Sequence, residues 1–233
     1  MQLNFKRRLG QLRALRKDHS GVSVVEFALG FPILFTIALT SVDLTNLAIV
    51  HLKVSQVALN LADNLSRMGV PNGSKLQLRE IDVNDAFEAV RDQGASIKLV
   101  NNGRVILSSL ENQSGTQMIH WQRCIGLKSG TGYDSSYGTA TPFTTAGTTA
   151  TGNAGTAAPS GMGDAGAQVN APSGSGVMFV EVNYLYTPYF PWLYSSSRVH
   201  YVASFIVRDM RDFTQIYNPS PAATRATCDV YGT

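Results

Sequence analysis

One stretch of this sequence limits the possible folds more than any other. Residues 22–42 contain a single charged side chain, Glu26. As an α-helix rising about 1.5 Å per residue, the stretch is roughly 30 Å long, which is the thickness of the hydrocarbon core of a bilayer. The alternative is the core helix of a soluble protein, which would not need the basic segment that precedes this stretch.

Basic residues are concentrated at the N-terminus. Residues 1–21 have six basic and one acidic side chain, a net charge of +5, whereas the remaining residues have 13 basic and 15 acidic side chains, a net charge of −2. By the positive-inside rule, this asymmetry places the N-terminus in the cytoplasm and the residues after Asp43 on the other side. The mildly acidic remainder lacks the basic surface that nucleic-acid binding requires, so no nucleic-acid partner is expected.

A secretory signal peptide is a second alternative for the N-terminal segment. Such a peptide has a short basic region and 7–15 apolar residues that end in a small-x-small cleavage site. Here the basic region is long, and the apolar run of residues 27–42 does not end in a clean site of that kind. These features favour a signal anchor that stays in the membrane.

The helical pattern continues beyond Asp43. Apolar residues recur there at helical spacing as far as Met68, and the turn-forming residues 69–73 then end the helix. The sequence therefore predicts a transmembrane helix over residues 22–43 and an amphipathic stalk over 44–68, together about 70 Å long. Pro32 is expected to kink the span. Two separate helices broken near Asp43 are the alternative.

Residues 69–233 are expected to form a head outside the membrane. The pattern predicts a helix over residues 80–93 and a hairpin that pairs 96–100 with 104–110. Further strands are expected over residues 118–124, 177–186 and 199–208. An antiparallel sheet of four or five strands joined to a long helix gives an α+β fold.

Two segments of the head have unusual composition. Of the 51 residues from 126 to 176, 39 are Gly, Ser, Thr, Ala or Pro, which predicts a flexible insertion without a core of its own. Residues 189–194 form an aromatic loop, either a packing corner or an exposed patch for a partner subunit.

The chain has two cysteines, Cys124 and Cys228. In an oxidising compartment they are expected to form a disulfide, the alternative being two free thiols. Two cysteines without a nearby histidine cluster do not predict a metal site. No nucleophile, zinc-protease or P-loop motif is present, so neither an enzyme nor a cofactor is expected.

The residues around the start of the apolar stretch resemble a known processing signal. Gly21, four small or apolar residues, Glu26 and Phe27 follow a basic leader and begin a span, as in type IV pilins. The resemblance implies that a prepilin peptidase cleaves between Gly21 and Val22. It also implies that Glu26, with Phe27 beside it, docks on the N-terminal amine of a neighbouring subunit.

Within the pilins, the sequence is similar to the TadE-like family of the tight-adherence (Flp) pilus system. The likeness is good over residues 20–68 and looser over 118–126 and 177–212. Phe27, where major Flp pilins more usually have Tyr, favours a minor subunit, as does the length of the chain.

The resemblance implies a minor pseudopilin in the bacterial inner membrane, with a cytoplasmic N-terminus and a periplasmic head, that initiates or caps an adhesive pilus. Its implied partners are the prepilin peptidase, other pilin subunits, the inner-membrane assembly platform and the lipid bilayer. An uncleaved bitopic scaffold protein of a secretion or pilus assembly complex is the alternative.

Overall fold

The computed structural model describes residues 21–113, 115–150 and 155–232, so residues 1–20 of the expected leader lie outside the described part. Two longer helices, two short helical segments and seven strands follow one another in this described part. They are α2 (Val22–Arg67), β1 (Val70–Asn72), β2 (Lys75–Gln77), α3 (Glu80–Gly94), η1 (Ala95–Ile97), α4 (Leu99–Asn102), β3 (Gly103–Gln113), β4 (Thr116–Ile125), β5 (Thr156–Ala157), β6 (Gly176–Tyr186) and β7 (Ser197–Ile206). The predicted α+β class, with a long apolar N-terminal helix and an antiparallel sheet head, is confirmed.

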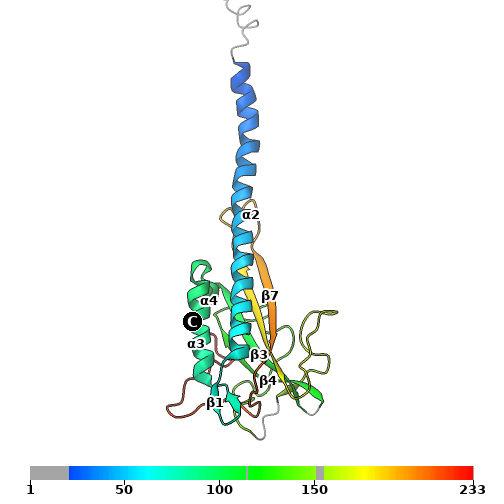
Figure 1. Ribbon diagram of the computed structural model, residues 1–233. Helices are drawn as coiled ribbons and strands as arrows, with labels where there is room; N and C mark the ends of the chain where they lie inside the picture. Colours follow the sequence, from blue (N-terminus) through cyan, green and yellow to red (C-terminus); the bar gives the residue numbers. More distant parts are fainter. Residues whose placement is uncertain (1–20, 114, 151–154, 233) are drawn as a thin grey trace, which may run out of the picture.

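Helix α2 is a single rod of 46 residues whose first half projects from the head (Figure 1). It passes Asp43 without interruption, so the alternative of two helices broken near that residue is wrong. It also continues through Pro32, and the kink expected there stays a prediction.

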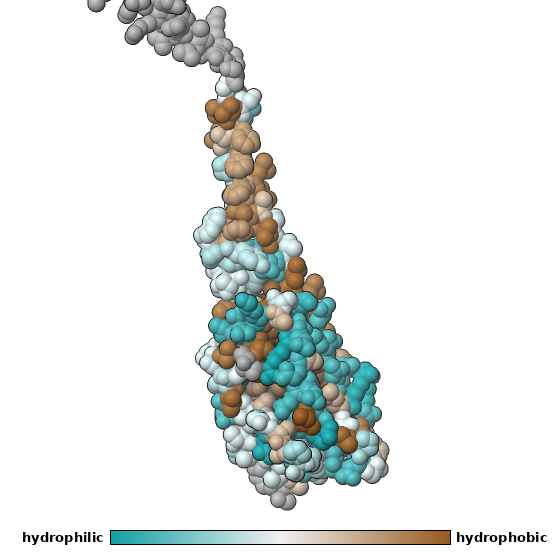
Figure 2. All heavy atoms as spheres, turned by 90° about the vertical axis from the view of Figure 1, so that its left-hand side faces the viewer, coloured by the Kyte–Doolittle hydropathy of each residue, from teal (hydrophilic) through white to brown (hydrophobic). Residues whose placement is uncertain are grey.

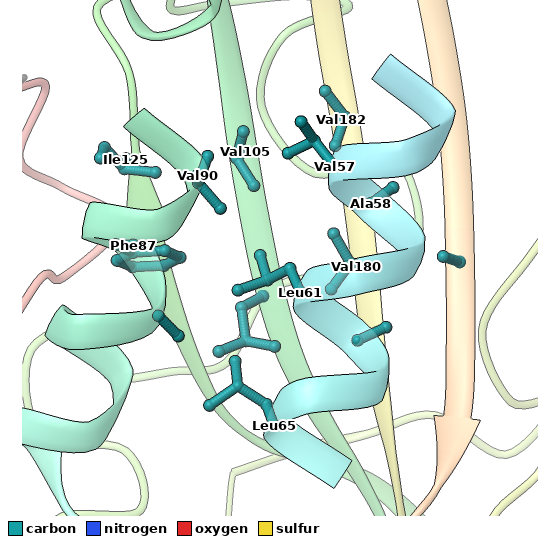
Figure 3. Packing of buried hydrophobic residues seen from close by; sticks show 14 of the residues in the cluster. Val57, Ala58, Leu61, Leu65, Phe87, Val90, Val105, Ile125, Val180 and Val182 are labelled. Carbon is teal, nitrogen blue, oxygen red and sulfur yellow. The ribbon is translucent and has the colours of Figure 1, made fainter. Parts of the chain in front are cut away.

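The second half of α2 forms the centre of the main hydrophobic core. Its apolar side chains lie three or four residues apart, on one face of a helix, and pack against β6, β7 and α3 (Figure 3). The buried members from α2 are Val50, Val54, Val57, Ala58, Leu61, Ala62 and Leu65. The stalk is therefore part of the head's core.

An arginine closes the lower end of α2. The Arg211 guanidinium donates hydrogen bonds to the carbonyl oxygens of Leu65 (2.8 Å) and Met68 (2.6 Å), which have no partner within the helix. Burial lowers the pKa of Arg211 to about 10, so the side chain remains charged at neutral pH. A cation at a helix C-terminus also interacts favourably with the helix dipole.

The main sheet has the strand order β5-β4-β3-β6-β7, and every pairing is antiparallel. Its hairpin joins β3 to β4, so the predicted pairing of residues 96–100 with 104–110 is wrong. Residues 95–97 and 99–102 are helical instead, because Leu99 and Val100 are buried in the core beside α3. Gly103 does not serve a hairpin turn: a Cβ there would lie 2.7 Å from the carbonyl oxygen of Asn183 on β6.

Helix α3 agrees with the sequence pattern. The Asp82 carboxylate accepts the backbone N–H of Arg79 (2.9 Å) and so caps the helix, and Phe87 and Val90 face the core. At the start of the same helix, Glu80 forms a fully buried ion pair with Arg123 of β4. This pair fixes α3 against the sheet.

The described part of the insertion, residues 126–150 and 155–176, packs against the face of the sheet opposite α2. It buries its apolar residues together with side chains of the sheet and not in a core of its own, and its flexibility stays a prediction. Small apolar residues of the insertion complete a second hydrophobic cluster with side chains of the strands. Its members are Leu110, Ile119, Ala140, Ala146, Ala158, Met162, Ala171, Val177 and Phe179.

Polar side chains of the sheet also hold the backbone of the insertion. Gln122 accepts the N–H of Ala140 (2.9 Å) and donates to the carbonyl oxygen of Gly138 (3.0 Å), while Glu181 accepts the N–H of Ser136 (3.1 Å). Buried polar groups need such partners, so the strands supply hydrogen bonds that a segment poor in apolar residues cannot supply itself.

Removing the Leu61 side chain should destabilise the head because it leaves a cavity at the contact between α2 and the sheet. We expect Leu61→Ala to lower the free energy of unfolding by about 3 kcal/mol, as for other buried leucines. The matched control is Leu59→Ala on the exposed side of the same helix, which should change it by about 0.5 kcal/mol or less. Urea unfolding of the full chain in detergent, followed by the fluorescence of buried Trp121, measures both.

Candidate membrane anchor and assembly site

The first half of α2 presents an apolar surface that nothing in the described chain covers. An 18-residue window of this helix has a mean hydropathy of 2.1, and none of it is buried. Figure 2 shows this half as a brown rod leaving the mainly teal and white head. By length and composition it is a candidate for a single membrane-spanning helix.

Three hydroxyl side chains within this half form hydrogen bonds to the helix's own backbone. Thr36, Thr40 and Ser41 each donate a hydrogen bond to the carbonyl oxygen four residues earlier, at 2.7–2.9 Å. In a hydrocarbon environment an unpaired hydroxyl is costly, so this pattern lets a polar residue lie in lipid.

Three phenylalanines form a stripe along one side of the helix. Phe27, Phe31 and Phe35 follow one another at four-residue intervals, with ring centroids 5.4 and 5.6 Å apart. All three rings are about half exposed or more. The stripe is a continuous aromatic surface that can pack against lipid chains or another apolar helix.

Glu26 stands at the upper end of this stripe. Its side chain is exposed, and it makes no hydrogen bond or ion pair within the described part of the chain. Gly21 lies just before the helix and accepts the N–H of Val25 (3.1 Å), and the space around its Cα is open. Val22 and Glu26 are four residues apart and share a helix face. Glu26 is thus an accessible carboxylate on an otherwise apolar surface.

The structure reveals a second carboxylate site, at the junction between the rod and the head. Asp43 is 3% exposed, and its two oxygens accept the backbone N–H groups of Tyr189 (2.8 Å) and Phe190 (3.2 Å). The Tyr186 hydroxyl donates to the carbonyl oxygen of Asp43 (2.9 Å). In the sequence, Asp43 is recognisable only as the first charged residue after the apolar run. Its hydrogen bonds to a loop 146 residues away could not be predicted from the residues around it.

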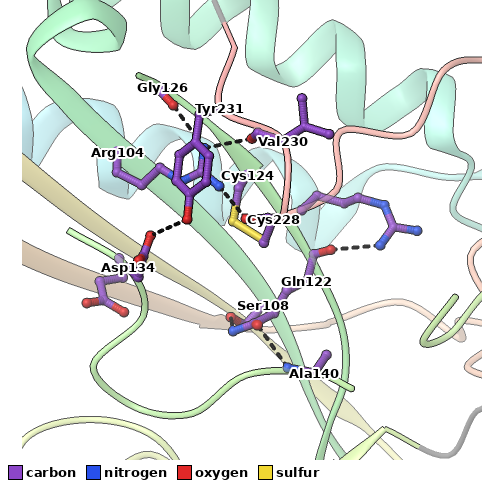
Figure 4. Close-up of a disulfide and its surroundings, with 12 residues drawn as sticks. Arg104, Ser108, Gln122, Cys124, Gly126, Asp134, Ala140, Cys228, Val230 and Tyr231 are labelled. Carbon is purple, nitrogen blue, oxygen red and sulfur yellow. Dashed lines mark hydrogen bonds between the residues drawn. A yellow bond between two sulfur atoms is a disulfide. The ribbon is translucent and has the colours of Figure 1, made fainter. Parts of the chain in front are cut away.

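The predicted disulfide between Cys124 and Cys228 is present in the head (Figure 4). It joins β4 to the C-terminal segment across 104 residues. Beside it, the buried Arg104 donates to the carbonyl oxygens of Cys228 (2.7 Å) and Val230 (2.9 Å). Burial lowers the pKa of this guanidinium.

The two strand histidines lie in polar contacts within the head. His120 is buried with its Nδ1 2.8 Å from a carboxylate oxygen of Glu111, and His200 contacts the Asn183 side chain and the Tyr137 hydroxyl. The His200 contact with Tyr137 joins the sheet to the insertion, whereas His120 and Glu111 pair within the sheet, between β4 and β3. Within residues 21–113, 115–150 and 155–232, no three His, Cys, Asp or Glu side chains are grouped to hold a metal ion.

Comparison with known protein families gives a match to the helical anchor segment of the chain. Residues 21–63 match the sequence model of the TadE-like protein family, which confirms the resemblance seen in the sequence. The match begins at Gly21 and covers the apolar rod and most of the stalk, but not the sheet. The matched segment is 43 of the 233 residues, and a TadE-like segment suggests a protein associated with the Tad pilus. No curated protein and no solved structure matches the chain.

Loss of the disulfide should destabilise the head without changing the anchor. We expect Cys228→Ser to lower the free energy of unfolding by about 2–5 kcal/mol, because the unfolded chain is then no longer constrained by a link across 104 residues. Cys124→Ser should have a similar effect, and adding Cys228→Ser to it should cost little more, since both remove one bond. Urea unfolding of the oxidised full chain in detergent measures this, and equal stabilities of wild type and single variants would contradict it.

Proposed function

We propose that this protein is a minor pseudopilin of the Tad pilus, cleaved by a prepilin peptidase and joined to other pilin subunits through its apolar rod. In this role it initiates or caps assembly of an adhesive pilus. The role is structural, and no enzymatic activity is part of it. The protein lies in the bacterial inner membrane with its N-terminus in the cytoplasm and its head in the periplasm, consistent with the basic leader.

One observation carries the proposal: residues 22–42, the first half of α2, are apolar and mostly exposed, and Glu26 is the single charged residue among them. Such an apolar surface has to be shielded from water, first by the lipid of the bilayer and then by the equivalent helices of neighbouring subunits. A helix that only anchored a head would need neither an accessible carboxylate at this depth nor a glycine five residues before it.

Glu26 then acts as a docking charge. Cleavage after Gly21 creates an ammonium group at Val22, and Glu26 of a neighbouring subunit is the carboxylate proposed to pair with it. At about 4 Å and an effective dielectric constant of 20, the pair gains about 4 kcal/mol before desolvation. The pairing would fix the axial position of one subunit against the next, with Phe27 packing beside it.

The size of the head favours a minor subunit over a major pilin. After cleavage at Gly21 the chain would still have 212 of its 233 residues, most of them in the head. An elaborate head on a short rod is suited to a subunit present in few copies, at a tip or in an initiating complex, where it does not have to repeat along the fibre.

Processing tests this proposal first. With the cognate prepilin peptidase present, we expect the protein from membranes to begin at Val22, and without it at Met1, as measured by intact mass and N-terminal sequencing. Gly21→Leu should block the conversion almost completely, because a bulky side chain prevents close approach of the protease to the backbone. Gly30→Leu, at a position within the helix that also has open space around it, is the control and should be processed normally. An unprocessed Met1 start in both samples would favour the uncleaved scaffold.

Docking is a separate expectation. Glu26→Gln removes the charge and keeps the size, so processing should persist while binding to other pilin subunits weakens by about tenfold or more, corresponding to at least 1.4 kcal/mol. Glu88→Gln, an exposed surface carboxylate on α3, should leave binding unchanged. Co-purification of tagged subunits from membranes measures both, and unchanged yield with Glu26→Gln would remove the docking role.

A further inference from the structure

The loop between β6 and β7, residues 187–196, lies where α2 leaves the head (Figure 1). Its ten residues include Tyr189, Phe190, Trp192 and Tyr194 and no charged side chain. Trp192 is 70% exposed and Tyr189 is 68% exposed, although both are large enough to be valuable in a core. The core-packing interpretation of this loop therefore does not hold for these two rings.

The loop has a defined shape. The N–H groups of Leu193 and Tyr194 donate to the carbonyl oxygen of Phe190 (2.9 and 3.1 Å), which forms a tight turn. The ring of Phe190 packs edge-on against Trp192, with centroids 6.0 Å apart. The turn is thus built to present its rings outward.

Asp43 fixes the position of this loop along the axis of α2. Its carboxylate binds the N–H groups of Tyr189 and Phe190, so the loop starts level with Asp43 on the helix. Asp43 is 21 residues after Val22, which corresponds to about 32 Å along a helix and so to the thickness of the bilayer's hydrocarbon core. If the upper end of the rod lies at one surface of the bilayer, the loop lies at the other.

We infer that residues 187–196 are an interfacial anchor, which inserts Tyr189 and Trp192 into the headgroup region of the bilayer leaflet that faces the head. Trp and Tyr favour this region because their rings are apolar at one end and polar at the other. The lack of charge in the loop fits lipid contact, and Asp43 holds the rings in place beside the span. The inference rests on the membrane anchoring included in the proposed function, but not on cleavage or docking.

Tryptophan fluorescence of the full chain in phosphatidylcholine vesicles tests the inference. The chain has two tryptophans, and Trp121 is buried in the head, so the difference between wild type and Trp192→Phe isolates the signal of Trp192. We expect bromine atoms on the lipid chains near the headgroups to quench Trp192 severalfold more than bromine atoms near the chain ends. Iodide in the water should quench it only weakly.

Asp43 variants test how the loop is held. Asp43→Ala removes both acceptors, so lipid quenching of Trp192 should fall severalfold and iodide quenching should rise, whereas Asp43→Asn should give an intermediate result. Asp63→Ala, lower on the same helix and paired with Arg67, is the matched control and should behave as wild type. An intact Cys124–Cys228 bond and unchanged Trp121 emission verify that each variant is folded.

Three outcomes would overturn the inference in distinguishable ways. Strong iodide quenching without lipid quenching, in protein that resists carbonate extraction, would reject the interfacial loop and leave the membrane anchor intact. Protection from both quenchers that increases with protein density in the vesicles would assign the loop to contact with a second copy. Release of the protein by carbonate would reject the anchor itself, and the loop with it.

Discussion

The contact between the second half of α2 and the sheet is the interaction on which the rest of the structure depends. Its side chains form the centre of the main core, and Arg211 and Asp43 tie the lower end and the middle of the helix to the head. Without this packing, one face of the sheet would be exposed to solvent, and the apolar first half of α2 would no longer be fixed to the head. The helix that enters the bilayer and the helix that organises the head are one element, so the anchor cannot vary independently of the fold.

The sequence pattern was sufficient for features that follow from local periodicity. The apolar run and the helical spacing of residues such as Val54, Leu61 and Leu65 predicted a continuous rod with an amphipathic lower half. Alternation and β-branched residues predicted β4, β6 and β7 close to their observed positions. The disulfide followed from the cysteine count and the expected compartment. Gly21, Glu26 and Phe27 were singled out because a motif, a leader and a span occur together, and their roles stay predictions.

Features that depend on contacts between distant segments could not be predicted. The alternating pattern of residues 96–100 and 104–110 indicated a hairpin, but the burial of Leu99 and Val100 against α3 favours helical turns there. The insertion was expected to be flexible because its own composition cannot form a core. Its partners are Gln122 and Glu181 of the sheet, whose side chains satisfy its backbone, and no local pattern identifies a polar strand residue as buried. The Asp43 site was missed for the same reason.

The unbroken rod also has a mechanical consequence. A head joined to its span by a loop can keep its orientation when the span tilts, but this head has no such joint at Asp43. Membrane helices tilt by about 20° on average, and the part of α2 below Asp43 extends about 36 Å, so a tilt of that size moves the far end of the head by about 12 Å. Any partner that reorients the span therefore moves the head with it, as a rigid lever. Conversely, a force applied to the head is transmitted to the bilayer through the same helix.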